Sequence, residues 1–234
     1  MNSLHLLCLE IKRPALVQFA RGQGLLRHDD EGHGYTLHAW LAAMFGAYAP
    51  RPFRLLESRA ELLGYTAADA RTLTEHAQTF ASPQAWSALV PESLGTKPMP
   101  LTWRPGQRLQ VDVLACPVSR KDDSEKDVYL RALDRLGDAA PPRAEVYIDW
   151  FRRQWADAVT FEHVELSGLG RHRLLRRGRA EGEGRRPRSI ERPQASFRAV
   201  VRVGDAAAFG RLLTRGIGRH RAFGFGMVLL SPVP

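Results

Sequence analysis

The chain has 234 residues, and its lysines and arginines outnumber its aspartates and glutamates by 34 to 25. The net charge of +9 and the isoelectric point near 10.2 indicate a polyanionic partner, with nucleic acid ranked before an anionic membrane surface. No apolar run approaches the roughly 20 residues that a membrane span needs, so we expect a cytoplasmic protein without a membrane segment. Cys8 and Cys116 both lie in apolar runs and are expected to be buried thiols in a reducing compartment, not a disulfide or a metal pair.

Hydropathy patterning in the first half of the chain predicts strands and helices separated by polar, glycine-rich or proline-rich stretches. In chain order these are a strand at Leu4–Ile11, a loop at 20–34, a helix at Tyr35–Phe45, a pair of strands at Phe53–Glu57 and Glu61–Tyr65, a helix at Ala67–Phe80, and a stretch at 82–106 that is mostly loop with room for one strand. The first helix is well defined, because its apolar residues recur at helical spacing and form one stripe. This stripe consists of Leu37, Trp40, Leu41 and Met44.

The second half begins with a strand at Arg108–Ala115, where apolar and polar residues alternate regularly. Residues 117–143 are polar and charged and are expected to form a flexible connector. The elements expected after it are an amphipathic helix at Glu145–Ala156, a strand at Phe161–Leu166, a basic segment at Gly170–Arg192, a strand at Phe197–Val203, a helix at Asp205–Arg215 and a strand at Met227–Leu230. The apolar positions of the amphipathic helix are Val146, Ile148, Trp150, Phe151 and Trp155, and we expect both tryptophans in the core, not stacked on bases.

This order of elements predicts an α+β fold with antiparallel sheets, because strand, helix, two strands, helix and strand occur in that order twice. We therefore expect tandem ferredoxin-like (RRM-like) domains, with an N-terminal domain at residues 1–103 and a C-terminal domain at 104–234. The connector and the arginine-rich insertion, at about 170–192, interrupt the second copy.

A glycine-rich loop, GIGRHRAFGFG, spans Gly216–Gly226 between the last predicted helix and strand. Gly216, Gly218, Gly224 and Gly226 would let the backbone approach a phosphate closely, or would serve a tight connection that needs positive φ angles. Arg219, His220 and Arg221 project from the same loop, and we expect Arg219 or Arg221 to contact RNA.

The arginine-rich insertion is a second candidate for nucleic-acid binding, since arginine-rich segments often become ordered only on RNA. The alternative is a disordered solubilising loop, but a solvated face would mix charges of both signs more evenly. The arginines concerned are Arg171, Arg173, Arg176, Arg177, Arg179, Arg185, Arg186, Arg188 and Arg192.

His38 is the candidate catalytic residue, because the pKa of histidine lies near working pH and suits proton transfer. Tyr35 precedes it by one helical turn, so both side chains share a face near the start of a helix, where backbone N–H groups favour a phosphate. On the residues alone, a half-buried histidine beside Leu37 and Trp40 is the stronger interpretation. His28, Asp29, Asp30 and His33 form a solvated polar loop in our interpretation, and we expect no metal site.

Four stretches together resemble one family, the CRISPR repeat-processing endoribonucleases of the CasE-like (type I-E) branch. They are the glycine loop with the following MVLLSP, the strand region PGQRLQVDVLACP at Pro105–Pro117, the helix at Glu145–Trp155, and Tyr35-Thr36-Leu37-His38. The arginine-rich insertion departs from this branch and resembles the arginine-rich finger of type IV processing enzymes.

The resemblance implies a catalytic His38 with Tyr35 as its partner, either as general base or as general acid. It implies metal-independent cleavage without a cofactor, leaving a 2′,3′-cyclic phosphate and a 5′-hydroxyl. The implied partners are the hairpin of CRISPR precursor RNA, the mature CRISPR RNA and other subunits of a Cascade-like effector complex.

Two other functions are compatible with the charge and the fold. A module of the same fold would cap the CRISPR RNA hairpin without cutting it, and His38 would then be structural. An unrelated tandem RRM protein would carry aromatic-rich RNP stretches on its central strands, and FRAVVRV and LQVDVLA are not such stretches. The chain shows no helix-turn-helix pattern, which disfavours a DNA regulator.

Overall fold

A computed structural model describes residues 3–25, 34–100, 102–121, 124–177 and 187–233, apart from the side chains of 175–177 and 187–189. The chain forms two compact units. The first unit consists of Met1–Pro100, His172–Glu191 and Ala222–Gly224, and the second consists of Leu101–Arg171, Arg192–Arg221 and Phe225–Pro234.

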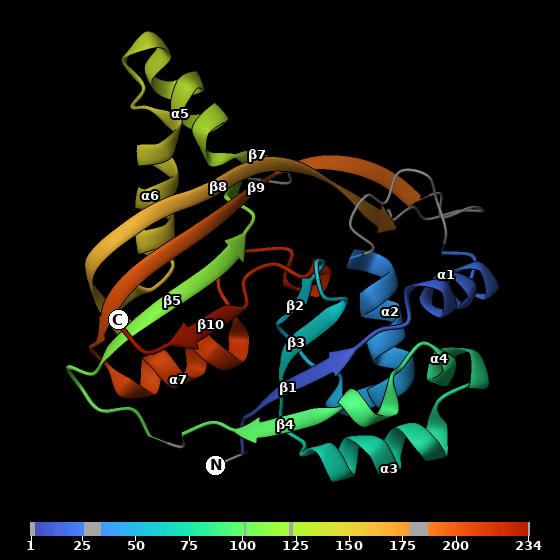
Figure 1. Ribbon diagram of the computed structural model, residues 1–234. Coiled ribbons are helices and arrows are strands. Elements are labelled where there is room, and N and C mark those ends of the chain that lie inside the picture. The colour runs from blue at the N-terminus through green and yellow to red at the C-terminus, as the bar shows by residue number, and fades with distance from the viewer. Residues whose placement is uncertain (1–2, 26–33, 101, 122–123, 178–186, 234) are drawn as a thin grey trace. The chain divides into compact units, whose positions relative to one another are not determined.

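The first unit is built on a four-stranded sheet with the strand order β2-β3-β1-β4 (Figure 1). Its strands are β1 (His5–Glu10), β2 (Phe53–Leu56), β3 (Glu61–Thr66) and β4 (Gly95–Pro98), and each neighbouring pair is antiparallel. Its helices are α1 (Arg13–Gly22), α2 (Gly34–Phe45), α3 (Ala70–Phe80) and α4 (Pro83–Ser87), with 3-10 turns at η1 (Gly46–Tyr48) and η2 (Pro91–Ser93).

The core of the first unit lies where α2 packs on the sheet. The predicted apolar stripe of α2 is confirmed, because Leu37, Trp40, Leu41 and Met44 are all buried. They belong to the same core cluster as Leu7 and Leu9, which occupy one face of β1. Burial of such side chains supplies most of the free energy that holds α2 in place.

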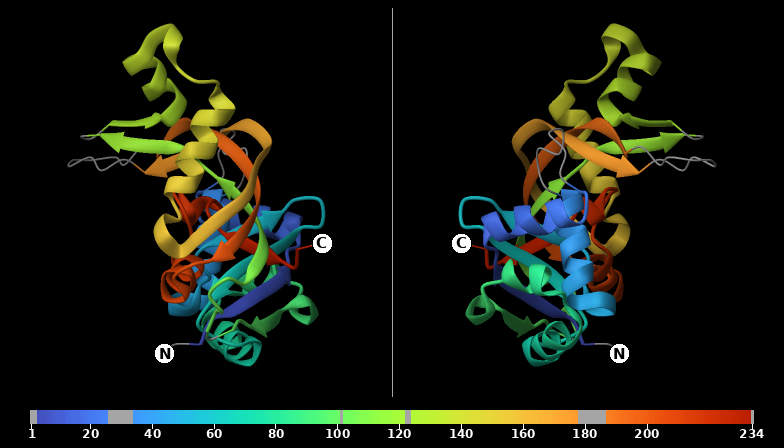
Figure 2. Two further views of the ribbon diagram at one scale, coloured as in Figure 1. Left: turned by 90° about the vertical axis from the view of Figure 1, so that its left-hand side faces the viewer. Right: turned by 90° about the vertical axis from the view of Figure 1, so that its right-hand side faces the viewer.

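The second unit is built on a sheet with the strand order β10-β5-β9-β8 (Figure 1). Its strands are β5 (Arg108–Ala115), β8 (Val159–Arg177), β9 (Pro187–Val203) and β10 (Val228–Ser231), except that the end of β8 and the start of β9 are counted with the first unit. Its main helices are α6 (Arg143–Arg153) and α7 (Ala206–Arg215), and a 3-10 turn, η4 (Ala156–Ala158), follows α6. The pair β8–β9 forms a long curved ribbon, as Figure 2 shows.

Both sheets place the first and third strands of their βαββαβ segment at the centre and the second and fourth at the edges. In the second sheet, the pairs β10–β5 and β5–β9 are antiparallel. The predicted α+β class and the tandem ferredoxin-like organisation are confirmed. The division of the chain at residues 103 and 104 stays a prediction. None of the helices that the structure describes is long and apolar enough to cross a membrane.

The prediction of a flexible connector at 117–143 is wrong. This stretch forms the hairpin of β6 (Val118–Lys121) and β7 (Ser124–Asp127), then α5 (Val128–Leu136) and the turn η3 (Gly137–Ala139). The Asp127 carboxylate caps α5 by accepting a hydrogen bond from the Tyr129 N–H at 2.8 Å. Arg143 and Tyr147 of α6 each donate to the other oxygen of Asp127 at 2.8 Å, so buried polar bonds order this charged stretch.

Smaller corrections concern helices in stretches that were assigned to loops. Helix α1 extends to Gly22, beyond the predicted start of a loop at residue 20, and α4 lies within the stretch 82–106. Ser82 caps α4 by accepting from the Ala85 N–H at 3.2 Å. In α6 the buried side chains are Tyr147, Trp150 and Phe151, whereas Val146 and Ile148 are only half-buried.

The two cysteines are free thiols. Cys116 is buried, as predicted, whereas Cys8 is half-buried on β1 and its thiol donates to the Glu61 carboxylate at 2.9 Å. Burial, together with the bond to Glu61, raises the pKa of Cys8 to about 12, so this thiol is protonated and unreactive at neutral pH.

Candidate functional site

The start of α2 carries the candidate catalytic pair of the first unit. Helix α2 begins at Gly34, and a Cβ atom at this position would lie 2.8 Å from the carbonyl oxygen of Phe223. Glycine therefore permits the close approach of the Phe223 backbone, which also belongs to the first unit. Tyr35 and His38 follow one turn apart, and both side chains are half-buried.

Tyr35 is positioned by an aromatic contact. Its ring stacks on the ring of Phe223 with the centroids 6.4 Å apart and the planes inclined by 29°. Such a contact restricts the rotamers of Tyr35, because two large rings exclude alternative packing. The glycine loop thus contributes Phe223 to the surroundings of Tyr35, a contact that the sequence did not predict.

His38 lies beside a cation, because Nη2 of Arg51 is 3.4 Å from Nε2 of the imidazole. Burial of the ring and the positive charge of Arg51 both lower the pKa of His38 below the usual value for histidine. The imidazole is therefore neutral at neutral pH. A neutral imidazole beside a guanidinium is suited to accept a proton at a site where negative charge also develops.

Arg51 is held in position through its backbone. Its N–H donates to the carbonyl of Tyr65 on β3 at 3.1 Å, and the Tyr65 N–H donates to the carbonyl of Pro52 at the same distance. Its side chain is exposed. Sequence reasoning missed Arg51, because nothing in the turn after η1 distinguishes this arginine from the others in the chain.

The glycine-rich loop connects α7 to β10. The φ angles of Gly216, Gly218, Gly224 and Gly226 are 70°, 67°, 89° and 77°, all in the region that favours glycine. At Gly226 a side chain would also overlap the carbonyl oxygen of Ile217, whose N–H donates to the Gly226 carbonyl at 2.9 Å. The tight connection that was one interpretation of these glycines is present.

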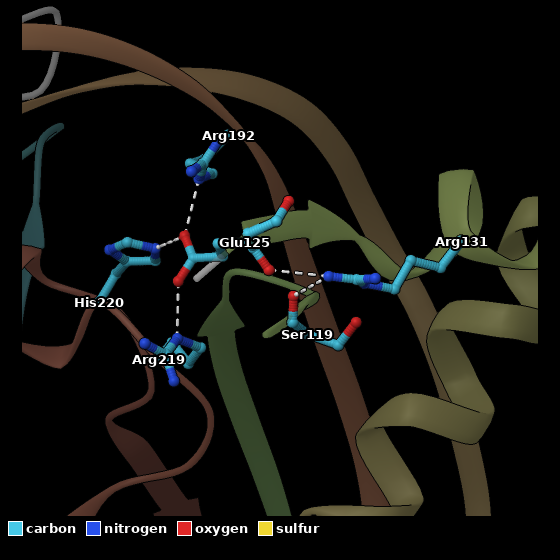
Figure 3. A network of polar contacts seen from close by, with 7 residues as sticks. Ser119, Glu125, Arg131, Arg192, Arg219 and His220 are labelled. Carbon is cyan, nitrogen blue, oxygen red and sulfur yellow. Dashed lines mark hydrogen bonds and ion pairs between the residues drawn. The ribbon is translucent and has the colours of Figure 1, made fainter. Parts of the chain in front are cut away.

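A buried carboxylate gathers three basic side chains beside this loop (Figure 3). Glu125 of β7 is only 5% exposed, and its Oε1 lies 2.8 Å from Nε of Arg192 and 2.6 Å from Nε2 of His220. Its Oε2 accepts from Nε of Arg219 at 2.6 Å. Burial raises the pKa of Glu125, but His220, Arg219 and Arg192 outweigh this effect and hold the pKa at about 2.

Two further arginines of the loop region lie close to this network. Arg221 donates from Nη1 to the carbonyl of Arg215 at 2.7 Å. Burial lowers the pKa of Arg221, and the like charges of Arg215 and Arg219 lower it further. The loop region thus concentrates positive charge, and the RNA contact by Arg219 and Arg221 stays a prediction.

The structure describes only part of the predicted arginine-rich contact surface. Arg171 and Arg173 lie on β8 with exposed side chains. Arg176, Arg177 and Arg188 lie on described strands, but their side chains fall outside the description, and Arg179, Arg185 and Arg186 lie outside the described residues altogether. His28, Asp29, Asp30 and His33 also lie outside them.

Solved structures of CRISPR RNA-processing proteins have a similar fold. The chain is similar to a CRISPR endoribonuclease Cse3 bound to a 19-nucleotide RNA, with a TM-score of 0.66 and 17% identity over 98% of this chain and 100% of that chain. Cse3 of Thermus thermophilus, bound to an RNA that represents a pre-cleavage complex, gives a TM-score of 0.61 and 16% identity over 98% and 100% of the two chains. Cas6e of Escherichia coli K-12 gives 0.52 and 17% over 99% and 100%.

At these identities the structural similarity establishes the fold. The sequence has no significant match among curated proteins. A family model described as CRISPR associated protein matches residues 6–232, which is nearly the whole chain. The chain therefore belongs to this family of CRISPR-associated proteins.

Proposed function

We propose that this protein is a metal-independent endoribonuclease of the cytoplasm that recognises the repeat hairpin of CRISPR precursor RNA and cuts beside it. It then stays bound to the mature CRISPR RNA as a subunit of the effector ribonucleoprotein. The family, the fold shared with Cse3 endoribonucleases and the net charge of +9 support this proposal. The observation that carries it is the neutral His38 with Arg51 at 3.4 Å, one turn into a helix that starts at Gly34.

The proposed reaction is attack of a ribose 2′-hydroxyl on the adjacent phosphodiester. His38 takes the proton of the 2′-hydroxyl, the 2′-oxygen forms a bond to phosphorus, and the bond from phosphorus to the 5′-oxygen breaks. Tyr35 supplies a proton to the leaving 5′-oxygen, and Arg51 stabilises the charge on the phosphoryl oxygens. The products are a 2′,3′-cyclic phosphate and a 5′-hydroxyl, and neither a metal nor a cofactor takes part.

The direction of the pKa shift supports the role of general base over that of general acid. Because the pKa of His38 lies below its usual value, the imidazole is mostly neutral at neutral pH and lacks the acidic proton of an imidazolium. Arg51 favours the same state, since its guanidinium can donate to Nε2 only when that nitrogen is unprotonated.

The RNA is proposed to be held by basic side chains through its shape and backbone charge. The C-terminal segment at 104–234 supplies them. The proposed contacts are Arg171, Arg173, Arg176, Arg177, Arg179, Arg185, Arg186 and Arg188 of the arginine-rich insertion, and Arg219 and Arg221 of the glycine loop, whose glycines at 216, 218, 224 and 226 bring the backbone close to phosphate.

The test is a cleavage assay with the cognate repeat RNA in EDTA, comparing the native protein with His38→Ala and with His76→Ala as a control. His76 is also a half-buried histidine of the first unit, so its loss controls for packing. The native protein and the control are expected to cut, and His38→Ala should be slower by about 100-fold or more with hairpin affinity kept. Release of the 3′-terminal phosphate by phosphatase only after acid treatment would identify the cyclic phosphate.

Other outcomes lead to other functions. Equal cleavage by His38→Ala and by the native protein would remove His38 from the mechanism. Tight binding of the hairpin by every variant without any cleavage would identify the protein as a non-catalytic capping subunit of the effector complex.

A further inference from the structure

Three arginines of the second unit lie close together where α7 leads into the glycine-rich loop. Arg215 ends α7, and its carbonyl accepts from Nη1 of Arg221 at 2.7 Å. The charge of Arg219 acts on Arg221 as well. Like charges at such a position repel one another, and an anion that binds among them relieves the repulsion. The three are called the loop arginine cluster below.

The carboxylate of Glu125 bonds one member of this cluster, Arg219 (Figure 3). It bonds Arg219 through Nε alone, and among the described residues the Nη groups of Arg219 form no other hydrogen bond. The side chain of Arg219 is 40% exposed while that of Glu125 is 5% exposed. The guanidinium is therefore fixed on its inner edge by a buried anion, and its outer edge keeps N–H donors toward solvent.

We propose that Glu125 is a positioning residue for RNA binding, and that by fixing Arg219 beside Arg215 and Arg221 it builds a site for a backbone phosphate of the RNA. This inference rests on the proposed function, since the phosphate belongs to the bound hairpin. It adds to that function a residue of the opposite charge, which strengthens the binding of a polyanion although it is itself an anion.

The charges around Glu125 permit this role. The carboxylate carries one negative charge against the positive charges of Arg192 and Arg219, so the network keeps a net positive charge even with His220 neutral. Arginine loses considerable side-chain freedom when it orders on a phosphate. An arginine that is already fixed in the free protein avoids that cost on binding.

The Glu125 carboxylate also joins separate parts of the chain. Arg192 comes from β9 at the end of the arginine-rich insertion, while Arg219 and His220 come from the glycine loop. His220 has a φ of 59°, which is uncommon for a residue with a side chain, and its bond to Glu125 at 2.6 Å holds the loop in that conformation. Loss of the carboxylate would remove its bonds to Arg192, Arg219 and His220, and with them one link between β9 and the glycine loop.

The first experiment measures binding of the cognate repeat hairpin, with a 2′-deoxyribose at the cleavage position so that no cutting occurs. The variants are Glu125→Gln and, as a matched control, Glu162→Gln, which also removes a carboxylate that pairs with two arginines of the second unit, Arg108 and Arg202. We expect Glu125→Gln to bind about tenfold more weakly, and the control to bind as tightly as the native protein or slightly more tightly. If Glu125 acts only through its charge, Glu125→Gln binds more tightly, and the inference is overturned.

A second measurement separates positioning from loss of structure. Arg219→Gln should weaken binding on its own, and adding Glu125→Gln to it should cause little further loss, because the carboxylate acts through Arg219. An equal loss from Glu125→Gln in both backgrounds would show that its effect does not pass through Arg219 and would overturn the inference. If Glu125→Gln melts below the assay temperature, Glu125→Asp, which keeps the charge but shortens the side chain, should still weaken binding.

The two proposals fail in different ways. If the native protein does not prefer the repeat hairpin to a scrambled RNA of equal length, both the proposed function and this inference fail. If the native protein binds the hairpin and Glu125→Gln binds it equally well, only the inference about Glu125 fails.

Discussion

Nη2 of Arg51 lies 3.4 Å from Nε2 of His38, so a fixed positive charge faces the nitrogen that would accept a proton. This arrangement has two effects that act in the same direction. It disfavours the imidazolium form, and it supplies a guanidinium next to the position where a scissile phosphate would develop charge.

The first prediction concerns the pH dependence of cleavage. Because the folded-state pKa of His38 is lowered, its base form predominates above that pKa, and the single-turnover rate should rise with pH with a midpoint below the usual histidine value of 6.5. Arg51→Gln removes a cause of the lowered pKa, so the rise should move toward higher pH and the plateau rate should fall. If Arg51→Gln does not change the dependence of the cleavage rate on pH, Arg51 does not affect the ionisation of His38.

The second prediction separates the hydroxyl of Tyr35 from its ring. Tyr35→Phe keeps the stacking on Phe223 but removes the proposed proton donor, so the cleavage rate should fall roughly 10- to 100-fold with the melting temperature unchanged. Phe223→Leu serves as the companion variant, because it removes the stacking and leaves the hydroxyl. Full activity of Tyr35→Phe would reduce Tyr35 to a packing residue.

The third prediction tests the geometry of the glycine loop. Gly226→Ala places a methyl group against the Ile217 carbonyl at a φ of 77°, so it should lower the free energy of unfolding by about 2 kcal/mol or more. Gly95→Ala is the control, because a Cβ there meets nothing within 4 Å and should cost little. Chemical denaturation measures the free energy of unfolding of both variants. Equal values for Gly226→Ala and Gly95→Ala would contradict the loop conformation.

The fourth prediction concerns stability in acid. The pKa of Glu125 is about 2 in the folded protein against an ordinary value of 4.5, so its ion pairs stabilise the fold above the ordinary value and are lost as pH falls toward 2. As pH is lowered from about 5 to about 2, the melting temperature should therefore fall less steeply for Glu125→Gln than for the native protein. If the melting temperatures of both proteins fall equally steeply with pH, Glu125 is not held ionised by its neighbours.

The general fold could be predicted from the sequence because burial imposes periodicity. Leu37, Trp40, Leu41 and Met44 are spaced for one helical face and are all buried, and the alternation at Arg108–Ala115 matches the bounds of β5. The hairpin β6–β7 and helix α5 were missed, because polar bonds and not apolar runs order them. Asp127, for example, accepts hydrogen bonds from Arg143 and Tyr147, which lie on a helix that begins sixteen residues later in the chain.

The candidate site was predictable only in part for a related reason. A histidine in Tyr-x-x-His is visible in the sequence, as is a cluster of glycines. Arg51 and Glu125 become significant only through what lies next to them in space, and each is a common residue in an unremarkable stretch. Long-range ion pairs leave no periodic signal, so they require the structure.

The first compact unit includes Ala222–Gly224, which follow helix α2 at a long distance along the sequence. A ribosome therefore releases Phe223 long after it has released Tyr35 and the rest of helix α2. The packing at the start of α2 must wait until Phe223 has been synthesised, so a nascent chain that stops before Phe223 lacks the contact that positions Tyr35. Under the proposed mechanism, a chain that stops before Phe223 should consequently cleave RNA more slowly than one that contains it.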